Sequence, residues 1–211
     1  MKRGFAGVIA IVGWLAIALE FYLTLAQPRA EGVDAGERII RFFSYFTILT
    51  NVLVAITTSA IAFFPATRAG KFFSRPGVQT AVAVYITVVG AVYSLLLRAS
   101  LTGLWAVADH AVHDLIPVAF VVFWFVCTPK SGLKWPDAFK WLSYPLVYVV
   151  YSLIHGGFTG WYPYWFVDIS KLGYGVGLRN AAGVVAGFVV IGLIFVLVGR
   201  LFSRTAKALS N

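Results

Sequence analysis

The 211-residue chain is 60% hydrophobic and 12% charged, whereas soluble domains are about 45–50% apolar and about 25% charged. This composition excludes an ordinary soluble domain and predicts a single transmembrane domain over residues 1–211. The net charge of +9 does not indicate nucleic acid binding, because the basic residues follow the two sides of the predicted membrane. The single cysteine, Cys127, excludes an intramolecular disulfide.

A helix needs about 20 apolar residues to cross the hydrocarbon core of a bilayer. Six stretches meet this need, at residues 4–26, 42–64, 77–98, 109–128, 138–156 and 181–203. The sequence therefore predicts an all-α integral membrane bundle of six transmembrane helices. The connections rich in Pro and Gly are expected to be loops, at residues 27–32, 65–71 and 128–132. The longest connection, 157–180, carries several Trp and Tyr residues, which are typical of the membrane interface.

The basic residues predict how these helices are oriented. With six spans, the N-terminus, the second and fourth loops and the C-terminus share one side, which carries 11 of the 17 Lys and Arg residues: Lys2, Arg3, Arg68, Lys71, Arg75, Lys130, Lys134, Lys140, Arg200, Arg204 and Lys207. The opposite side carries Arg29, Arg38, Arg41, Arg98, Lys171 and Arg179. An excess of Lys and Arg marks the cytoplasmic side. We therefore expect both termini in the cytoplasm. The short loops are typical of a bacterial protein, so the membrane is expected to be the bacterial inner membrane.

Ionisable and polar residues within the predicted spans gather at one depth. An ionisable group inside a membrane is costly to place and indicates a functional site. At 1.5 Å per residue, the predicted span 109–128 places its polar residues roughly 2–8 Å below the outer end, and Thr47 lies about 9 Å below the start of its span. Four spans contribute such residues: Glu20, Thr47, His110, His113, Asp114 and His155.

Helical spacing predicts which of these side chains meet. His110, His113 and Asp114 stand at i, i+3 and i+4, so they are expected on one face, and Asp109 is four residues before His113. Pro117 removes a backbone hydrogen bond just beyond them. In the second span a polar stripe is expected to face the interior of the bundle, formed by Ser44, Thr47, Thr50 and Asn51.

A hydroxyl on one helix and an imidazole on another, oriented by a carboxylate, form a nucleophile–base pair. Asp109 or Asp114 is the candidate to orient His113, and Asn51, Thr50 or His155 is expected near a developing oxyanion. Two alternatives use the same residues. Zinc bound by His110, His113 and His155 is one, and a proton-linked carrier is the other. Glu20 is expected to pair with Arg98 or a basic residue of the first loop, and Arg98 to anchor at the interface or clamp a carboxylate.

Three segments, in order, resemble the family of androgen-induced and androgen-dependent TFPI-regulating multipass membrane proteins. They are the aromatic-rich stretch around Thr47 (residues 43–51), Asp109-His110-Ala111-Val112-His113 followed by Pro117, and His155 followed by the Thr-Gly-Trp-Tyr-Pro run at 159–163. The resemblance implies a multipass hydrolase of lipid esters, such as fatty acid esters of hydroxy fatty acids. It matches Thr47 to the nucleophile and His113 to its histidine partner.

The leading hypothesis is therefore a membrane-embedded hydrolase of lipid-like carboxylic esters with Thr47 as nucleophile and His113 as base, acting toward the outer side on an amphiphilic ester. It needs no cofactor and no nucleic acid, and it leaves the oligomeric state open. Its supporting or substrate-binding residues are expected to be Asp109, His110, Asp114, Thr50, Asn51, His155, Glu20 and Arg98. The alternative is a non-enzymatic membrane protein that binds a metal or a lipid.

Overall fold

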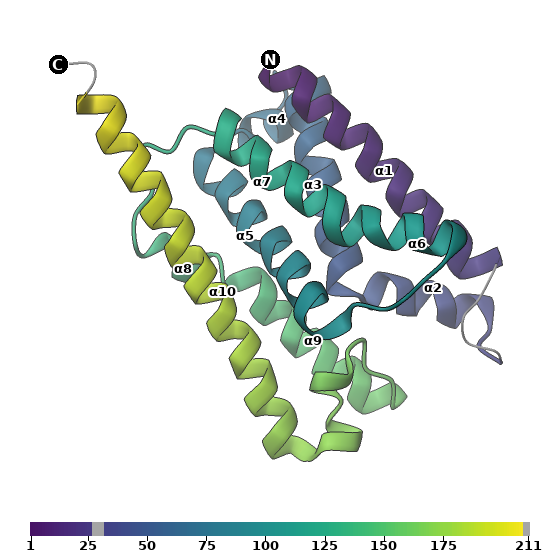
Figure 1. The fold of residues 1–211 in the computed structure, drawn as a ribbon. Helices are drawn as coiled ribbons and strands as arrows, with labels where there is room; N and C mark the ends of the chain where they lie inside the picture. Colours follow the sequence, from purple (N-terminus) through teal and green to yellow (C-terminus); the bar gives the residue numbers. More distant parts are fainter. Residues whose placement is uncertain (27–31, 209–211) are drawn as a thin grey trace. The chain divides into compact units, whose positions relative to one another are not determined.

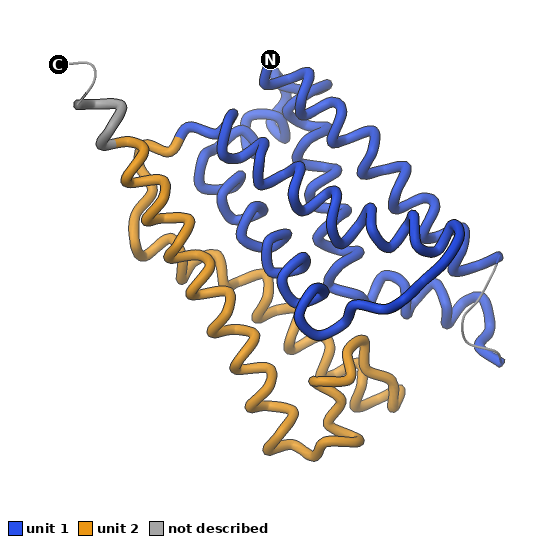
Figure 2. The backbone as a smooth tube through the Cα atoms, viewed as in Figure 1, with its two compact units in different colours: residues 1–129 blue, residues 130–211 orange. Residues whose placement is uncertain are grey.

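The computed structural model describes residues 1–26 and 32–208. The regular elements in this part of the chain are all helical, as the composition predicts. Most of the predicted loop 27–32 lies outside the described residues, with Arg29 and Glu31, and so do the side chains of Arg204 and Lys207. The chain divides into two compact units, residues 1–129 and 130–211 (Figure 2). The single domain stays a prediction.

Unit 1 is a bundle of antiparallel helices (Figure 1). Helix α1 (Lys2–Ala26) packs mainly against α3 (Phe46–Phe63), and α5 (Pro76–Val92) against α7 (Ile116–Cys127). The N-terminus, α4 (Arg68–Phe73) and the end of α7 lie at one end of the bundle. The other end holds α2 (Ala35–Ser44), α6 (Gly103–His110) and the turn that joins α5 to α6.

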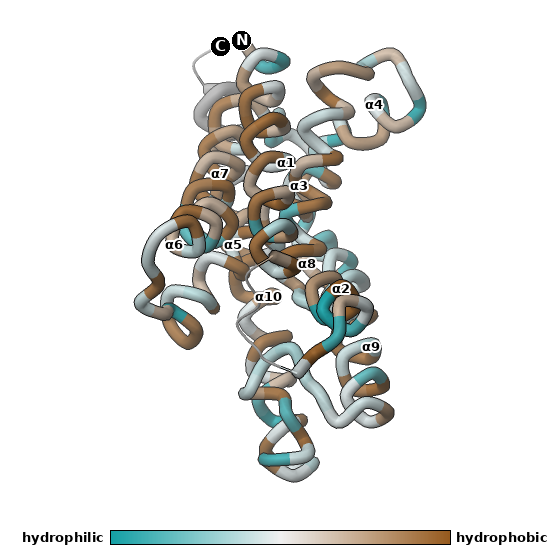
Figure 3. Tube along the Cα trace, turned by 90° about the vertical axis from the view of Figure 1, so that its right-hand side faces the viewer, coloured by the Kyte–Doolittle hydropathy of each residue, from teal (hydrophilic) through white to brown (hydrophobic). Residues whose placement is uncertain are grey.

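Five helical stretches in the described residues are long and apolar enough to cross a membrane: Lys2–Ala26, Phe46–Phe63, Pro76–Leu97, Gly103–Cys127 and Ile169–Ser203. Figure 3 shows hydrophobic residues along the bundle helices and more hydrophilic ones at α2 and α4. The predicted stretch 138–156 forms two helices instead, α8 (Asp137–Lys140) and α9 (Ser143–Thr159). The 17 residues of α9 rise about 26 Å, against a hydrocarbon core of about 30 Å. Six spans therefore stay a prediction.

The predicted second span, 42–64, is broken at Tyr45, whose backbone is extended (φ −78°, ψ 127°). The segment before the break carries Glu37, Arg38 and Arg41 on an otherwise apolar helix. A helix with a charged face lies in the interface rather than across the bilayer, so the chain turns where α3 begins. As a result Ser44 ends α2 and Thr47 lies in the first turn of α3. The expectation that both belong to one helix was wrong.

The turn between α3 and α4 depends on a glycine. Thr67 caps α4, because its hydroxyl accepts a hydrogen bond from the Gly70 N–H at 3.0 Å and donates one to Phe64 O at 2.7 Å. This closed turn brings Gly70 so near the preceding backbone that a Cβ atom there would lie 2.1 Å from Phe64 O and 2.8 Å from Pro65 Cα. The close approach of the two backbone segments therefore requires glycine.

Gly70→Ala is expected to destabilise unit 1, because backbone atoms rather than a flexible side chain must move to admit the methyl group. Strain of this kind costs about 1–3 kcal/mol. Thermal unfolding in detergent micelles, followed by circular dichroism, measures the loss. Gly77→Ala is the matched control, since a Cβ there meets no atom within 4 Å. Equal melting temperatures for Gly70→Ala and Gly77→Ala would contradict the described turn.

Unit 2 contains α8, α9, a short 3₁₀ turn η3 (Trp165–Val167) and α10 (Ile169–Ala208), which is interrupted at Gly173 (φ 73°, ψ 160°). The predicted span 181–203 lies within α10. Asp168 caps the start of α10 by accepting hydrogen bonds from the N–H groups of Ser170 and Lys171. Burial alone would raise the pKa of Asp168, but the hydrogen bonds from Ser170 and Lys171 outweigh it and hold this pKa below its ordinary value.

Candidate functional site

Two π-helical turns in unit 1 build the candidate site. They are η1 (Tyr93–Leu97), which ends the α5 stretch, and η2 (Ala111–Leu115), which joins α6 to α7. In η2 the Ile116 N–H donates to Ala111 O, five residues back. Pro117 follows and has no N–H that could donate to Val112 O. The carbonyl of Val112, one residue before His113, is thus open to a partner from another helix.

That partner is Asn51 on α3. Its Nδ2 donates to Val112 O at 3.0 Å and to Thr47 O at 2.9 Å, so one buried amide joins α3 to η2. Thr47, Thr50 and Asn51 are all buried, with Thr47 7% exposed. The expectation that the polar residues of this helix face the bundle interior is confirmed. The Asn51 Oδ1 atom is buried and has no hydrogen-bond partner in the described part of the chain.

His113 is held by Asp109 and Tyr93. Its Nδ1 lies 3.2 Å from Asp109 Oδ1 and 3.0 Å from Asp109 O. Its ring stacks on Tyr93 with centroids 4.0 Å apart and planes 12° apart, and the Tyr93 hydroxyl donates to Asp109 Oδ2. The side chains of His113 and Asp109 are 15% and 10% exposed. Of the two acids predicted to orient His113, the structure therefore places Asp109 against it.

Asp114 belongs to a second, more exposed cluster. Arg98 donates to both of its carboxylate oxygens, at 2.7 and 3.3 Å, and the ring of His110 approaches Asp114 Oδ2 with Nδ1 at 2.8 Å. Arg98 also donates to Ser94 Oγ at 3.1 Å, and its guanidinium lies over the Tyr93 ring at 4.8 Å. Hydrogen bonding to Asp114 raises the pKa of Arg98 above its ordinary value. We call Arg98, His110 and Asp114 the outer cluster.

The split between the two clusters corrects an expectation. Regular helical spacing predicts His110, His113 and Asp114 on one face, but His113 contacts Asp109 while His110 contacts Asp114. Residues four apart on a helix contact each other whereas adjacent residues do not, so the pairs 109/113 and 110/114 form separately. Of the two pairings expected for Glu20, the one with Arg98 is not formed, since Arg98 pairs with Asp114, and the one with a basic residue of the first loop stays a prediction. Glu20 is buried in α1, at 8% exposed.

His155 lies in α9 of unit 2, within a local aromatic cluster. Its ring centroid is 5.6 Å from that of Tyr151 and 5.9 Å from that of Trp161, and its Nδ1 is 3.4 Å from Thr159 Oγ1. Because His155 and His113 belong to different units, a shared site stays a prediction. Among residues 1–26 and 32–208, no group of three or more His, Cys, Asp or Glu side chains is placed to hold a metal ion.

Tyr93 is the functional residue that sequence reasoning missed. Tyrosines near helix ends are common at membrane interfaces, so its type gives no signal. Its spacing gives a signal instead. Tyr93 lies five residues before Arg98, and their partners, Asp109 and Asp114, are also five residues apart. Comparison of the chain with models of protein families, with curated proteins and with solved structures gave no match.

Proposed function

We propose that the protein is a membrane-embedded hydrolase of lipid-like carboxylic esters, with Thr47 as nucleophile and His113 as general base. The observation that carries the proposal is the contact between the buried Asp109 and the partly buried His113. With Nδ1 directed to Asp109, the Nε2 atom of His113 is the position left to accept a proton. It has no hydrogen-bond partner in the described residues.

The surroundings of His113 suit a general base. A carboxylate beside Nδ1 fixes the tautomer of an imidazole and stabilises the imidazolium that forms when Nε2 takes a proton. The Tyr93 hydroxyl holds the second oxygen of Asp109, and the Tyr93 ring fixes the plane of His113. Tyr93 and Asp109 thus act in this proposal as positioning residues, while Thr47 and His113 touch the reacting atoms.

Thr47 carries the nucleophile in the resemblance, and its place in the fold supports that role. It is the second residue of α3, at the helix end where the macrodipole is positive and favours a developing oxyanion. Asn51 ties the Thr47 carbonyl to Val112, next to His113. Because His113 Nε2 is unpaired here, the Thr47 hydroxyl does not bond to it directly in the unliganded protein. Catalytic hydrogen bonds often form only in the substrate complex.

The proposed reaction has two steps. Thr47 Oγ attacks the ester carbonyl, its proton passes to His113 Nε2, and the alkoxy group leaves as an alcohol with that proton. A water molecule then attacks the acyl-threonine, again losing its proton to His113, which releases the carboxylic acid and restores Thr47. The outer cluster offers a guanidinium to an anionic substrate group, although Asp114 already binds it.

The same proposal includes the topology. The chain crosses the bacterial inner membrane six times, α9 being the shortest span, and both termini are cytoplasmic. Support comes from unit 1, where the end with the N-terminus and α4 carries Lys2, Arg3, Arg68 and Lys71. The candidate site lies toward the opposite end, near α2 and α6, and so faces the outer half of the membrane. A substrate that reaches it is amphiphilic.

Labelling by a fluorophosphonate tests the catalytic pair. Thr47→Ala and His113→Ala are expected to lose the label, because one removes the attacking oxygen and the other the proton acceptor. Thr58→Ala is the matched control. Thr58 lies on α3 about three turns from Thr47, and its buried hydroxyl donates to Val54 O and Ala55 O. Mass spectrometry should locate the adduct on Thr47. Unchanged labelling in Thr47→Ala, with a wild-type circular dichroism spectrum, would refute the proposal.

A further inference from the structure

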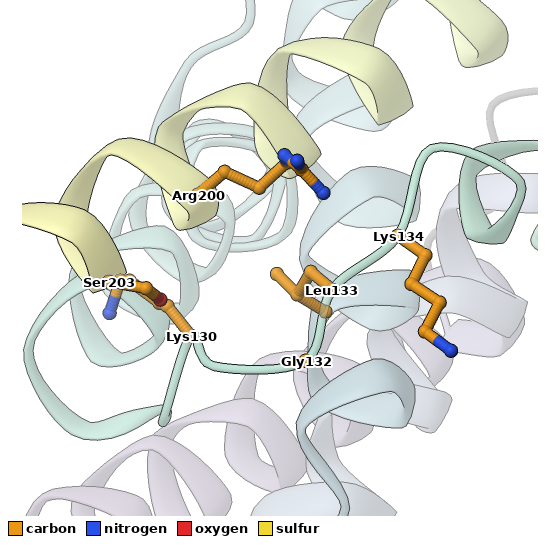
Figure 4. A pocket seen from close by; sticks show the side chains of 6 residues that line it. All are labelled: Lys130, Gly132, Leu133, Lys134, Arg200 and Ser203. Carbon is orange, nitrogen blue, oxygen red and sulfur yellow. The ribbon is translucent and has the colours of Figure 1, made fainter.

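Unit 2 contains a cavity of about 290 Å³ at one end of α10 (Figure 4). One wall comes from the segment before α8, with Lys130, Gly132, Leu133 and Lys134, and the other from α10, with Arg200 and Ser203. Figure 4 shows the three basic side chains at separate places around Leu133. Three of the six lining residues are thus cationic, and the lining contains no acid.

Two of the three cationic groups, those of Arg200 and Lys134, form no ion pair within the described residues. Arg200 and Lys134 have no carboxylate within 4 Å among the described residues, and the Arg200 guanidinium lies over the Trp135 ring at 5.6 Å. The nearest acid in sequence is Asp137, which pairs with Lys140 at 2.9 Å and accepts the Lys134 backbone N–H at 2.9 Å. The Asp137 carboxylate is therefore held by Lys140 and by the Lys134 backbone, and it does not bond the Arg200 guanidinium.

The floor of the cavity is apolar and closely packed. Leu133 is 5% exposed and lies against Gly199, where a Cβ atom would come within 2.7 Å of Leu133 Cδ1. The absence of a side chain at Gly199 thus lets the segment 130–134 seat against α10. Phe202, on the same turn of α10, has the Lys130 ammonium 5.9 Å from its ring centroid. A cavity with an apolar floor and a cationic rim fits an amphiphile with an anionic head.

The position of the cavity in the chain places it at the surface of the membrane. The apolar run of α10 gives way to basic residues at Arg200 and Arg204 in the sequence, and Lys130 follows three residues after Cys127, where the apolar stretch of α7 ends. Both walls therefore leave the hydrocarbon region at this point. Phosphate groups of lipids lie at the same level, just outside the hydrocarbon core.

We propose that this cavity binds the phosphate group of an anionic phospholipid. Basic pockets beside membrane helices recognise such head groups, and Arg presents a fork of N–H donors that matches phosphate oxygens. A free phosphate ion offers the same oxygens but makes no use of the apolar floor at the level of the membrane surface. The inference concerns unit 2 alone and does not depend on ester hydrolysis.

Native mass spectrometry of the full chain, released from detergent micelles with equimolar phosphatidylglycerol and phosphatidylcholine, tests the proposal. The wild type is expected to retain one phosphatidylglycerol in preference to phosphatidylcholine. Arg200→Gln and Lys134→Gln should each weaken that binding about five-fold, the effect of one basic residue near a lipid head group. Lys134 lies in a connecting segment, so its variant stays informative if Arg200→Gln fails to fold.

Arg179→Gln is the matched control, because it removes an exposed arginine from the other end of the same helix. It should leave phosphatidylglycerol binding unchanged. An equal loss with Arg179→Gln, or equal retention of phosphatidylcholine, would overturn the proposal. Displacement of the lipid by inorganic phosphate at similar concentration would identify a site for free phosphate and overturn the assignment to a lipid.

Discussion

Replacing Asp109 by asparagine is expected to lower kcat for ester hydrolysis by about 10²–10⁴-fold. The amide has the shape of the carboxylate but no charge to stabilise an imidazolium, and its NH₂ group competes for the position that holds His113 Nδ1–H. The imidazole is then no longer held in the tautomer whose Nε2 is free to accept a proton. Hydrolysis of a p-nitrophenyl acyl ester in micelles measures the change, which should fall on kcat with little effect on KM.

Tyr93→Phe separates the two functions of the site's aromatic ring. It keeps the stacking on His113 and removes the hydroxyl that donates to Asp109, so its kcat should lie between those of the wild type and Asp109→Asn. Asp109→Glu should recover part of the activity by restoring a carboxylate. Asp137→Asn in unit 2 is the control for loss of one acid. Full activity in Asp109→Asn would exclude Asp109 as the residue that positions His113.

Trp124→Ala is expected to cause the largest loss of stability in unit 1. Trp124 is 2% exposed between α7 and α5, and its indole N–H donates to Thr80 Oγ1 at 2.9 Å. Truncation leaves a cavity between two membrane-embedded helices and costs about 3–5 kcal/mol. For a chain of this length that corresponds to a fall in melting temperature of roughly 6–20 °C, measurable by circular dichroism in micelles.

Trp124→Phe identifies the part of this loss that comes from packing. It keeps a large aromatic ring and removes the N–H, while the Thr80 hydroxyl still donates to Pro76 O at 2.7 Å. Its stability should therefore lie close to that of the wild type. If Trp124→Phe and Trp124→Ala have the same melting temperature, the hydrogen bond to Thr80, rather than the volume of the side chain, holds α5 to α7.

Much of the fold follows from apolar stretch length alone. The helices at 2–26, 76–97 and 103–127 and the second half of α10 coincide with predicted spans because lipid leaves a backbone no other way to satisfy its hydrogen bonds. The break at Tyr45 was missed, because the apolar residues continue across it and only the charges of α2 indicate an interfacial segment. The division into α8 and α9 was missed for a similar reason: apolar residues continue through Trp141 and Leu142, while Pro145 cannot donate to Trp141 O.

The sequence predicted which residues form the candidate site better than it predicted which of them contact each other. The four-residue spacing of Asp109 and His113 correctly indicates contact, since it needs only one helical turn. The separation of Asp114 from His113 was missed because adjacent residues of a helix do not face each other. The close packing of α5 on η2 at Gly90 was missed as well: a Cβ there would lie 3.3 Å from His113 O and 3.4 Å from Pro117 Cβ. No regular period in the sequence expresses a contact of that kind.

The two π turns have a consequence for how such a site arises. A π turn contains one residue more than the α-helical turn that it replaces, so a single inserted codon in an ordinary helix is enough to create one. Here η1 supplies Tyr93 and η2 supplies His113, and the two residues stack on each other. Deleting one residue from either turn would therefore rotate one of these two side chains relative to the other and change the stacking of Tyr93 on His113.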